Sequence, residues 1–239
     1  MKIPWPYLSA LVRQSGSIVA AGMVLLTLVG ASSAAEIECK DYWNTDRQWR
    51  EMSAICEAGA RNGEPLSQVA VAIHLLNRGN LTDKARAEDL LRSAAAKGYD
   101  DAYYWLGGCQ ADANKAISYF EMANGSGGMG LMALVTAADT HFKGLGVPKD
   151  FQKARVVYRR AFEAMVDNAN RGIPKPPGEW WSNAKWFIGQ DAVVSVAERY
   201  GFAMKEVNGT TSVVEVEPHP ELSDKELAER LWQRLSGRK

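Results

Sequence analysis

Three stretches of the chain share one pattern of apolar and polar positions. The stretches 83–98, 112–127 and 150–165 align without gaps. Each has an Asp, then a basic residue and an Ala, then a pair of large apolar residues and a second Ala. The Ala residues and the apolar pair follow the spacing i, i+3, i+4 and i+7, which places them on one face of an α-helix. The pattern therefore predicts three amphipathic helices that each bury one face.

The ends of these stretches carry residues that start and stop helices. The initial Asp can cap the helix N-terminus and complement the helix dipole. At the other end, Gly98 and Gly127 stand where a left-handed C-cap would end the helix. Met165 takes that position in the third stretch, so the third helix is expected to continue. The residues assigned a structural role in the repeat are Asp83, Arg86, Ala87, Gly98, Asp112, Lys115, Ala116, Gly127, Gly144, Gly146, Asp150, Lys153 and Ala154.

A second helical stretch precedes each predicted helix. Before the third helix it covers 133–142, and a turn rich in Gly and Pro joins it to Asp150. Before the second it covers 102–107, and the turn is nearly missing. Successive units are 35, 29 and 38 residues long. Helix–turn–helix units of this length cannot bury a face alone, so we expect them to stack into a solenoid.

The pattern resembles that of the Sel-1-like repeats, which are relatives of the tetratricopeptide repeats. The resemblance covers about residues 67–165 and implies an all-α fold, an α/α solenoid of helix–turn–helix repeats. The chain is similar to exported bacterial members of this family. These members look like interaction modules, often in envelope assembly, polysaccharide or motility systems, or host contact. The positions in register in the third unit are Ala133, Gly144, Gly146, Val147, Asp150, Lys153, Ala154, Tyr158 and Ala161.

The first 35 residues have the features of a signal peptide. Lys2 and Arg13 accompany an apolar run over 18–30, and Ser33 and Ala35 supply the small residues of a cleavage site. The run is short for a helix that spans a bilayer, which needs about 20 residues. We therefore predict cleavage after Ala35, a periplasmic or secreted mature chain and no stable membrane insertion. A retained membrane anchor is the alternative.

Export makes a disulfide plausible among the three cysteines. Cys39 and Cys56 enclose a short stretch near the N-terminus and are the favoured pair. Cys109 lies inside the repeat region, where a free Cys usually acts as a small buried hydrophobic residue. The pairings 39–109 and 56–109 stay open.

The segments that flank the repeats have their own signals. Asn208-Gly209 between two strand-like runs predicts a β-hairpin over 202–217. Ser223 and Glu226 form a capping box that opens a last helix to about residue 235. The predicted organisation begins with a signal peptide over 1–35 and an N-terminal capping segment over 36–66, which contains a helix over 45–61. Repeats follow over 67–169, and a Pro/Gly-rich linker covers 170–179. The C-terminal extension covers 180–239 and begins with a helix over 182–200.

Motifs for catalysis or cofactor binding are missing from the sequence. The three His are not spaced as metal ligands, and the glycine-rich stretch 125–130 follows a helix, not a strand, so it reads as a loop between units. His74 and His141 stand where the repeat usually carries Tyr, which favours packing roles. With 28 basic and 28 acidic residues, the chain has no nucleic-acid footprint. We predict no metal, no cofactor and no nucleic-acid partner.

Two aromatic sets are candidates for a binding surface. Aromatic residues dominate both cores and interfaces, so core packing is the competing and favoured interpretation. The two sets are Tyr103, Tyr104 and Trp105, and Trp180, Trp181 and Trp186.

These features favour a non-enzymatic, exported scaffold that holds a protein partner in an adaptor or regulatory role. One alternative is a cell-wall-active hydrolase on the same repeat fold, although the related hydrolases carry paired Cys in every repeat. Another alternative makes the C-terminal extension the working element and the repeats its mount.

Overall fold

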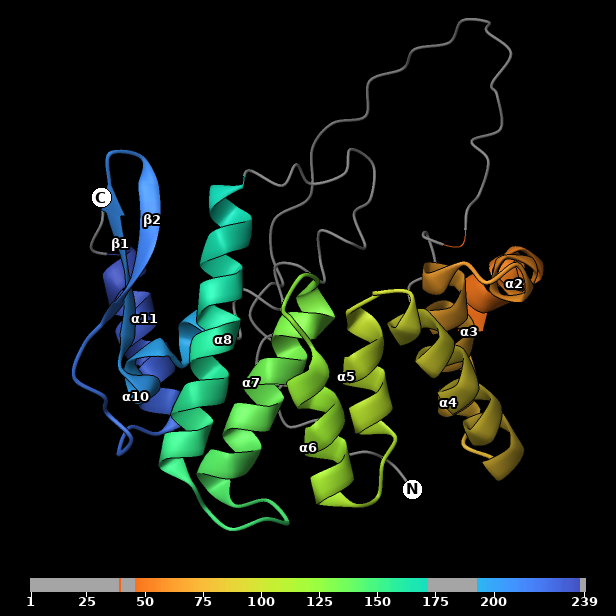
Figure 1. Ribbon diagram of the computed structural model, residues 1–239, viewed down its shortest axis with the longest axis horizontal. Coiled ribbons are helices and arrows are strands. Elements are labelled where there is room, and N and C mark those ends of the chain that lie inside the picture. Colours follow the sequence, from red (N-terminus) through yellow and green to blue (C-terminus); the bar gives the residue numbers. More distant parts are fainter. Residues whose placement is uncertain (1–38, 40–45, 172–192, 237–239) are drawn as a thin grey trace, which may run out of the picture. The chain divides into compact units, whose positions relative to one another are not determined.

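The computed structural model describes residue 39, residues 46–171 and residues 193–236, and these are mostly helical with one small antiparallel sheet near the C-terminus (Figure 1). The chain divides into units 1–37 and 38–239, and every described residue belongs to the second. In the described part, no helix has the length and apolar character that crossing a membrane requires. The predicted signal peptide and almost all of the predicted linker lie outside the described residues.

Six helices form three consecutive pairs. Within each pair the two helices pack against each other, and neighbouring pairs also touch through α4 with α5, α5 with α7 and α6 with α7. An additional helix, α2, packs against α3 and matches the helix predicted over 45–61. The bounds are Asp46–Arg61 for α2, Pro65–Arg78 and Leu81–Ala96 for α3 and α4, Asp101–Gly108 and Ala113–Met122 for α5 and α6, and Gly128–Lys143 and Phe151–Asn170 for α7 and α8.

Two of the three predicted Asp caps are present. The side chains of Asp112 and Asp150 accept the backbone N–H groups three residues later, each at 2.8 Å. The prediction for Asp83 is wrong, because Asn80 caps α4 by accepting the N–H of Asp83 at 2.8 Å. Asn80 is an equally good cap residue and comes first along the chain, so α4 begins at Leu81.

The prediction that Gly127 ends the second motif helix is also wrong. Gly98 is left-handed as predicted, with φ 81°, but Gly127 has φ −117° and caps the start of α7. The left-handed residue of this loop is Gly125, with φ 77°, because α6 already ends at Met122. In the third unit α8 continues past Met165, as expected.

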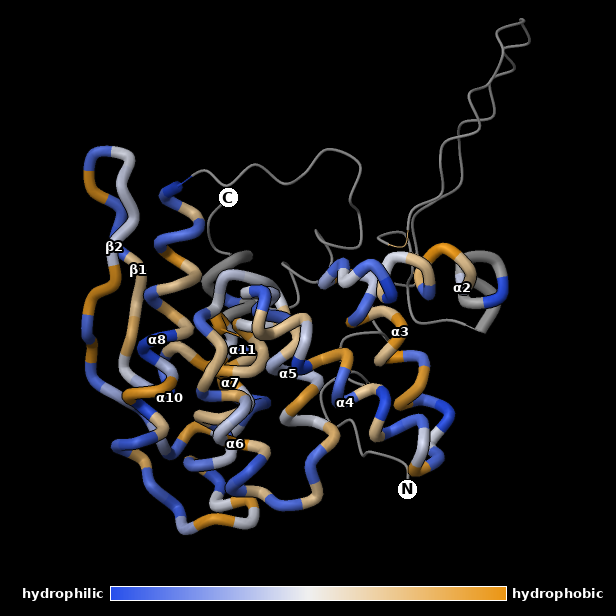
Figure 2. Tube along the Cα trace, turned by 45° about the vertical axis from the view of Figure 1, so that its right-hand side comes forward, coloured by the Kyte–Doolittle hydropathy of each residue, from blue (hydrophilic) through white to orange (hydrophobic). Residues whose placement is uncertain are grey.

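Two clusters of buried apolar side chains form the core. The first lies among α2, α3, α4 and α5, and the second among α6, α7, α8 and the C-terminal segment. In Figure 2, α3 and α7 carry long hydrophobic stretches, whereas α4 and α8 alternate hydrophilic and hydrophobic positions. The first helices of these pairs are therefore mostly enclosed, and the second helices bury one face only.

The C-terminal segment contains the predicted hairpin and capping box. Asn208 and Gly209 have φ 54° and 76°, the left-handed pair that a two-residue hairpin turn requires. The N–H of Ser223 donates to Glu226 Oε2 at 2.8 Å, and the N–H of Glu226 donates to Ser223 Oγ at 3.3 Å. The elements are α10 (Ala197–Tyr200), β1 (Phe202–Val207), β2 (Thr210–Glu215) and α11 (Asp224–Ser236).

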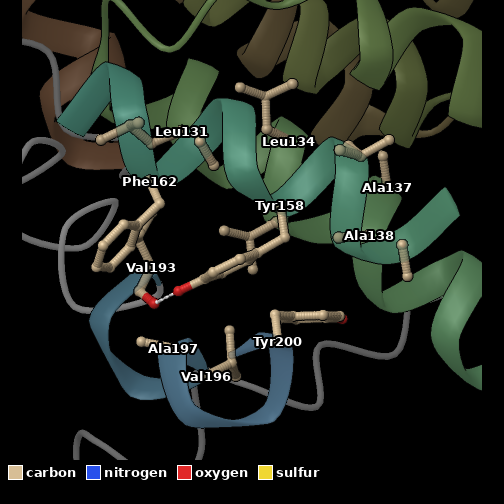
Figure 3. Close-up of a cluster of buried hydrophobic side chains, with 14 of the residues drawn as sticks. Leu131, Leu134, Ala137, Ala138, Tyr158, Phe162, Val193, Val196, Ala197 and Tyr200 are labelled. Atoms are coloured by element: carbon tan, nitrogen blue, oxygen red, sulfur yellow. Dashed lines mark hydrogen bonds between the residues drawn. The ribbon is translucent and has the colours of Figure 1, made fainter. Parts of the chain in front are cut away.

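This segment covers the apolar side of the last helix pair. The ring of Tyr200 stacks on that of Tyr158 with centroids 4.4 Å apart, and Phe202 stacks on Tyr158 and on Phe162. The Tyr158 hydroxyl donates to the carbonyl of Val193 (Figure 3). Residues 193–202 thus complete the core that α7 and α8 begin.

We predict that Phe202→Ala lowers the free energy of unfolding by about 3–5 kcal/mol, because the ring is 1% exposed and leaves a cavity against α8. Met204→Ala is the matched control, since Met204 lies two residues along the same strand and is 50% exposed, and it should cost less than about 1 kcal/mol. Urea unfolding followed by circular dichroism measures both. Equal losses in the two variants would show that the segment is not docked as described.

Candidate functional site

The first aromatic set lies on α5 and packs between the two core clusters. Tyr103 contacts both clusters, Tyr104 contacts Phe120 with centroids 6.1 Å apart, and Trp105 contacts the first cluster. All three side chains are half-buried. Three successive residues on a helix point in different directions, so they cannot form one flat binding face. The second set, Trp180, Trp181 and Trp186, lies outside the described residues.

Two neighbouring carboxylates bind the glycine-rich loop between α6 and α7. Asp100 accepts the backbone N–H groups of Asn124, Gly125 and Ser126 at 2.8, 2.9 and 3.1 Å. Asp101 accepts those of Met129 and Gly130 at 3.0 and 3.3 Å. Both Asp residues are buried. Three N–H groups of the loop and two at the start of α7 therefore point at carboxylates of the same chain.

This arrangement explains the glycines and excludes one function for the loop. A Cβ at residue 127 would lie 2.2 Å from Asp101 Oδ1, and a Cβ at residue 130 would lie 1.7 Å from Asp100 Oδ2. The loop connects two helices, as the sequence predicted, and the N–H groups of residues 124–126, 129 and 130 already donate to carboxylates, so these groups are not available to a phosphate. The Asp100-Asp101 pair at the start of α5 was the sequence signal for this contact, and it was missed.

A second group of charged residues fastens the C-terminal segment to α7. The side chain of Arg199 is 2% exposed and donates from Nη2 to Asp224 Oδ1 at 2.7 Å and to the carbonyl of Leu222 at 3.0 Å. The Tyr200 hydroxyl donates to Asp139 Oδ1 at 3.1 Å, and Lys143 pairs with Asp139 at 2.9 Å. Burial and the Asp139 charge raise the pKa of Tyr200 far above its usual range, so the hydroxyl stays protonated.

A third group lines a hollow of about 270 Å³ formed by α2, α3 and α4. Two ion pairs line the hollow. Arg86 pairs with Glu57, and Arg78 Nε pairs with Asp83 Oδ2 at 3.1 Å. The predicted packing residue His74 lines the hollow. The remaining lining residues are Ser53, Ala54 and Leu75.

The cysteines and the second histidine take structural positions. A disulfide joins Cys39 to Cys56, the pairing favoured from the sequence, and both residues are buried. Burial raises the pKa of the half-buried thiol of Cys109. His141 is buried, and its Nε2 lies 2.8 Å from Glu121 Oε1.

Over 46–171 and 193–236, no group of three or more His, Cys, Asp and Glu side chains is placed to hold a metal ion. Comparison with protein-family models, with curated proteins and with solved structures found no match to the chain.

Gly130→Ala should lower the free energy of unfolding by about 2–3 kcal/mol, because the methyl group displaces Asp100 and leaves buried N–H groups without acceptors. Gly108→Ala is the control, since a Cβ there meets no atom within 4 Å; in a helix it should be neutral or stabilise by up to about 1 kcal/mol. Thermal and urea unfolding compare the two. A harmless Gly130→Ala would contradict the contact.

The pH dependence of stability should reveal the buried Asp100. Burial, with a contribution from the Asp101 charge, raises the pKa of Asp100 above its ordinary value of 3.8. The folded chain therefore holds this proton to a higher pH than the unfolded chain does. The resulting stabilisation is complete below pH 3.8 and is lost as the pH rises through the folded pKa.

We expect the stability difference between wild type and Asp100→Asn to fall as the pH rises from 3 through the folded pKa, and then to level off. Urea unfolding of both proteins at a series of pH values measures this difference. A difference that stayed constant, or that rose with pH, would show that the Asp100 carboxyl is not held in this buried state.

Proposed function

We propose that the chain is an exported Sel-1-like repeat protein that binds a protein partner in a cell-envelope process and has no catalytic role. In this proposal the three helix pairs are successive turns of an α/α solenoid, and residues 36–66 and 180–239 cap its ends. One observation carries the proposal: each motif-bearing helix, α4, α6 and α8, packs against the helix before it, and each pair contacts the next. A stack of this kind presents an extended surface made by several units.

Exposed apolar side chains on α6 and α8 suggest where a partner binds. Val156 is 63% exposed on α8, and Met122 is 57% exposed at the end of α6. Arg160 of α8 bonds the end of α6, because its Nη2 donates to the carbonyls of Glu121 and Ala123, on either side of Met122, at 2.9 and 2.8 Å. Lys153, Val156 and Arg160 share one face of α8 by their spacing. We call Met122, Lys153, Val156 and Arg160 the α6–α8 surface.

The composition of the α6–α8 surface indicates the kind of partner. Apolar contacts beside cationic groups fit a segment that combines apolar and acidic side chains. The corresponding motif positions in the other units are polar, Asp89 and Ser118 at the place of Val156, so this character belongs to the third unit. The aromatic residues of α5 contribute mainly to packing in this proposal.

The alternative hypothesis treats the C-terminal extension as a separable working element. The burial of two of its aromatic side chains weakens this hypothesis. Tyr200 and Phe202 are at most 1% exposed and complete the core of α7 and α8. Deleting residues 178–239 would uncover Tyr158 and Phe162, so the truncated chain would lose stability together with any function of the extension. Point variants on the surface are therefore the appropriate test.

A photo-cross-linking residue at position 156, in the full chain expressed in its native host, should trap one discrete partner. The same residue at position 89, which is exposed at the matching place on α4, is the control and should trap that partner weakly or not at all. In a co-purification, Val156→Asp should reduce the recovered partner about tenfold or more without changing the melting temperature, whereas Asp89→Val should not. If neither position 156 nor position 122 gives a discrete adduct, the α6–α8 surface is not a binding site.

A further inference from the structure

The hollow among α2, α3 and α4 is a small recess that is open to solvent. Its volume of about 270 Å³ lies just below the range of about 300–1,000 Å³ that is typical of pockets for drug-sized ligands. Ala54 and Leu75 give it apolar lining, and Ser53 and His74 add polar groups. A ligand of a few heavy atoms would fit.

Both signs of charge are available at this hollow. Arg86 contributes Nη2 to its pair with Glu57 Oε2, and Arg78 contributes Nε to its pair with Asp83 Oδ2. One guanidinium nitrogen thus meets one carboxylate oxygen in each pair, and donors and acceptors remain for a ligand. The side chains of Arg78 and Arg86 are 57% and 50% exposed, and those of Asp83 and Glu57 are 17% and 25% exposed.

A ligand can compete with these two ion pairs at a small cost in free energy. Exposed ion pairs contribute only about 0–1 kcal/mol each. Their charges cancel, so a bare anion or a bare cation would be attracted by one partner and repelled by the other. A molecule with both charges can satisfy an arginine and a carboxylate together.

The wall of the hollow that carries Glu57 belongs to α2, which packs against α3. Glu57 follows Cys56, which is buried and bonded to Cys39. The other wall is held by α3 and α4, which pack closely, and Asp83 is fixed further by a hydrogen bond from Asn80 Nδ2 at 2.5 Å. A rigid arrangement of this kind lowers the entropic cost of binding.

We propose that this hollow binds a small zwitterion of the α-amino acid class. The ligand carboxylate would lie at Arg86 or Arg78, its ammonium group at Glu57 or Asp83, and a small apolar side chain against Ala54 and Leu75. This site is independent of the α6–α8 surface, because it uses the first helix pair and α2.

The test titrates the full mature chain with four probes and follows amide and arginine side-chain NMR signals. The probes are alanine, alanine methyl ester with only the ammonium charge, N-acetylalanine with only the carboxylate charge, and N-acetylalanine methylamide with neither. Alanine should give saturable shifts at the residues of the hollow, and each single-charge probe should bind about tenfold or more weakly.

Matched variants locate the site. Arg86→Gln should weaken alanine binding about tenfold or more. Arg92→Gln, which removes a comparable exposed arginine paired with Glu88 and Asp89, should change binding less than about twofold. Circular dichroism confirms that both variants fold. Equal binding of the neutral probe and alanine, unchanged binding in Arg86→Gln, or no saturable shift up to about 20 mM alanine would overturn the proposal.

Discussion

Covering the apolar faces of successive helix pairs is the requirement on which this fold depends. A helix pair buries one side against its neighbour, and the last pair has no neighbour of its own kind. Here residues 193–202 fill that place, with Tyr200 and Phe202 stacked on Tyr158. At the other end α2 packs against α3, and a disulfide links α2 through Cys56 to Cys39, which is also buried in this cluster. The described parts of the two flanks therefore belong to the core.

The middle unit is short because α5 and α6 have only 8 and 10 residues, and not because a turn is missing, since residues 109–112 connect them. The loop from α6 to α7, residues 123–127, turns sharply, and Gly125 permits the turn with a left-handed φ of 77°. The backbone N–H groups of this loop would destabilise the folded state if they were buried without acceptors. Asp100 and Asp101 supply those acceptors. The same carboxylates leave no room for side chains at Gly127 and Gly130, so the glycine-rich sequence and the Asp pair form one structural device.

Local patterns predicted the elements well, and the contacts between elements less well. The hairpin at Asn208-Gly209, the capping box at Ser223 and the caps at Asp112 and Asp150 depend on residues within four positions of one another, so the sequence contains them directly. Asp83 and Gly127 were misassigned because an ungapped alignment imposes the same boundary on every unit, whereas each loop sets its own. The bonds between Arg199 and Asp224 and between Tyr200 and Asp139 join residues 25 and 61 positions apart, and no local signal marks them. The hollow is equally invisible in the sequence, because three helices contribute its charges.

Distances between equivalent places in the three units test the repeat architecture most directly. Positions 89, 118 and 156 occupy the same place in the motif, and all three are exposed. Spin labels there, measured in pairs by double electron–electron resonance, should give similar distances for 89–118 and 118–156, agreeing within about 5 Å as expected for helices packed at a regular spacing, and a longer distance for 89–156. Neighbouring distances that differ widely, or a distance for 89–156 no longer than either of them, would show that the three stretches do not occupy equivalent places in successive units.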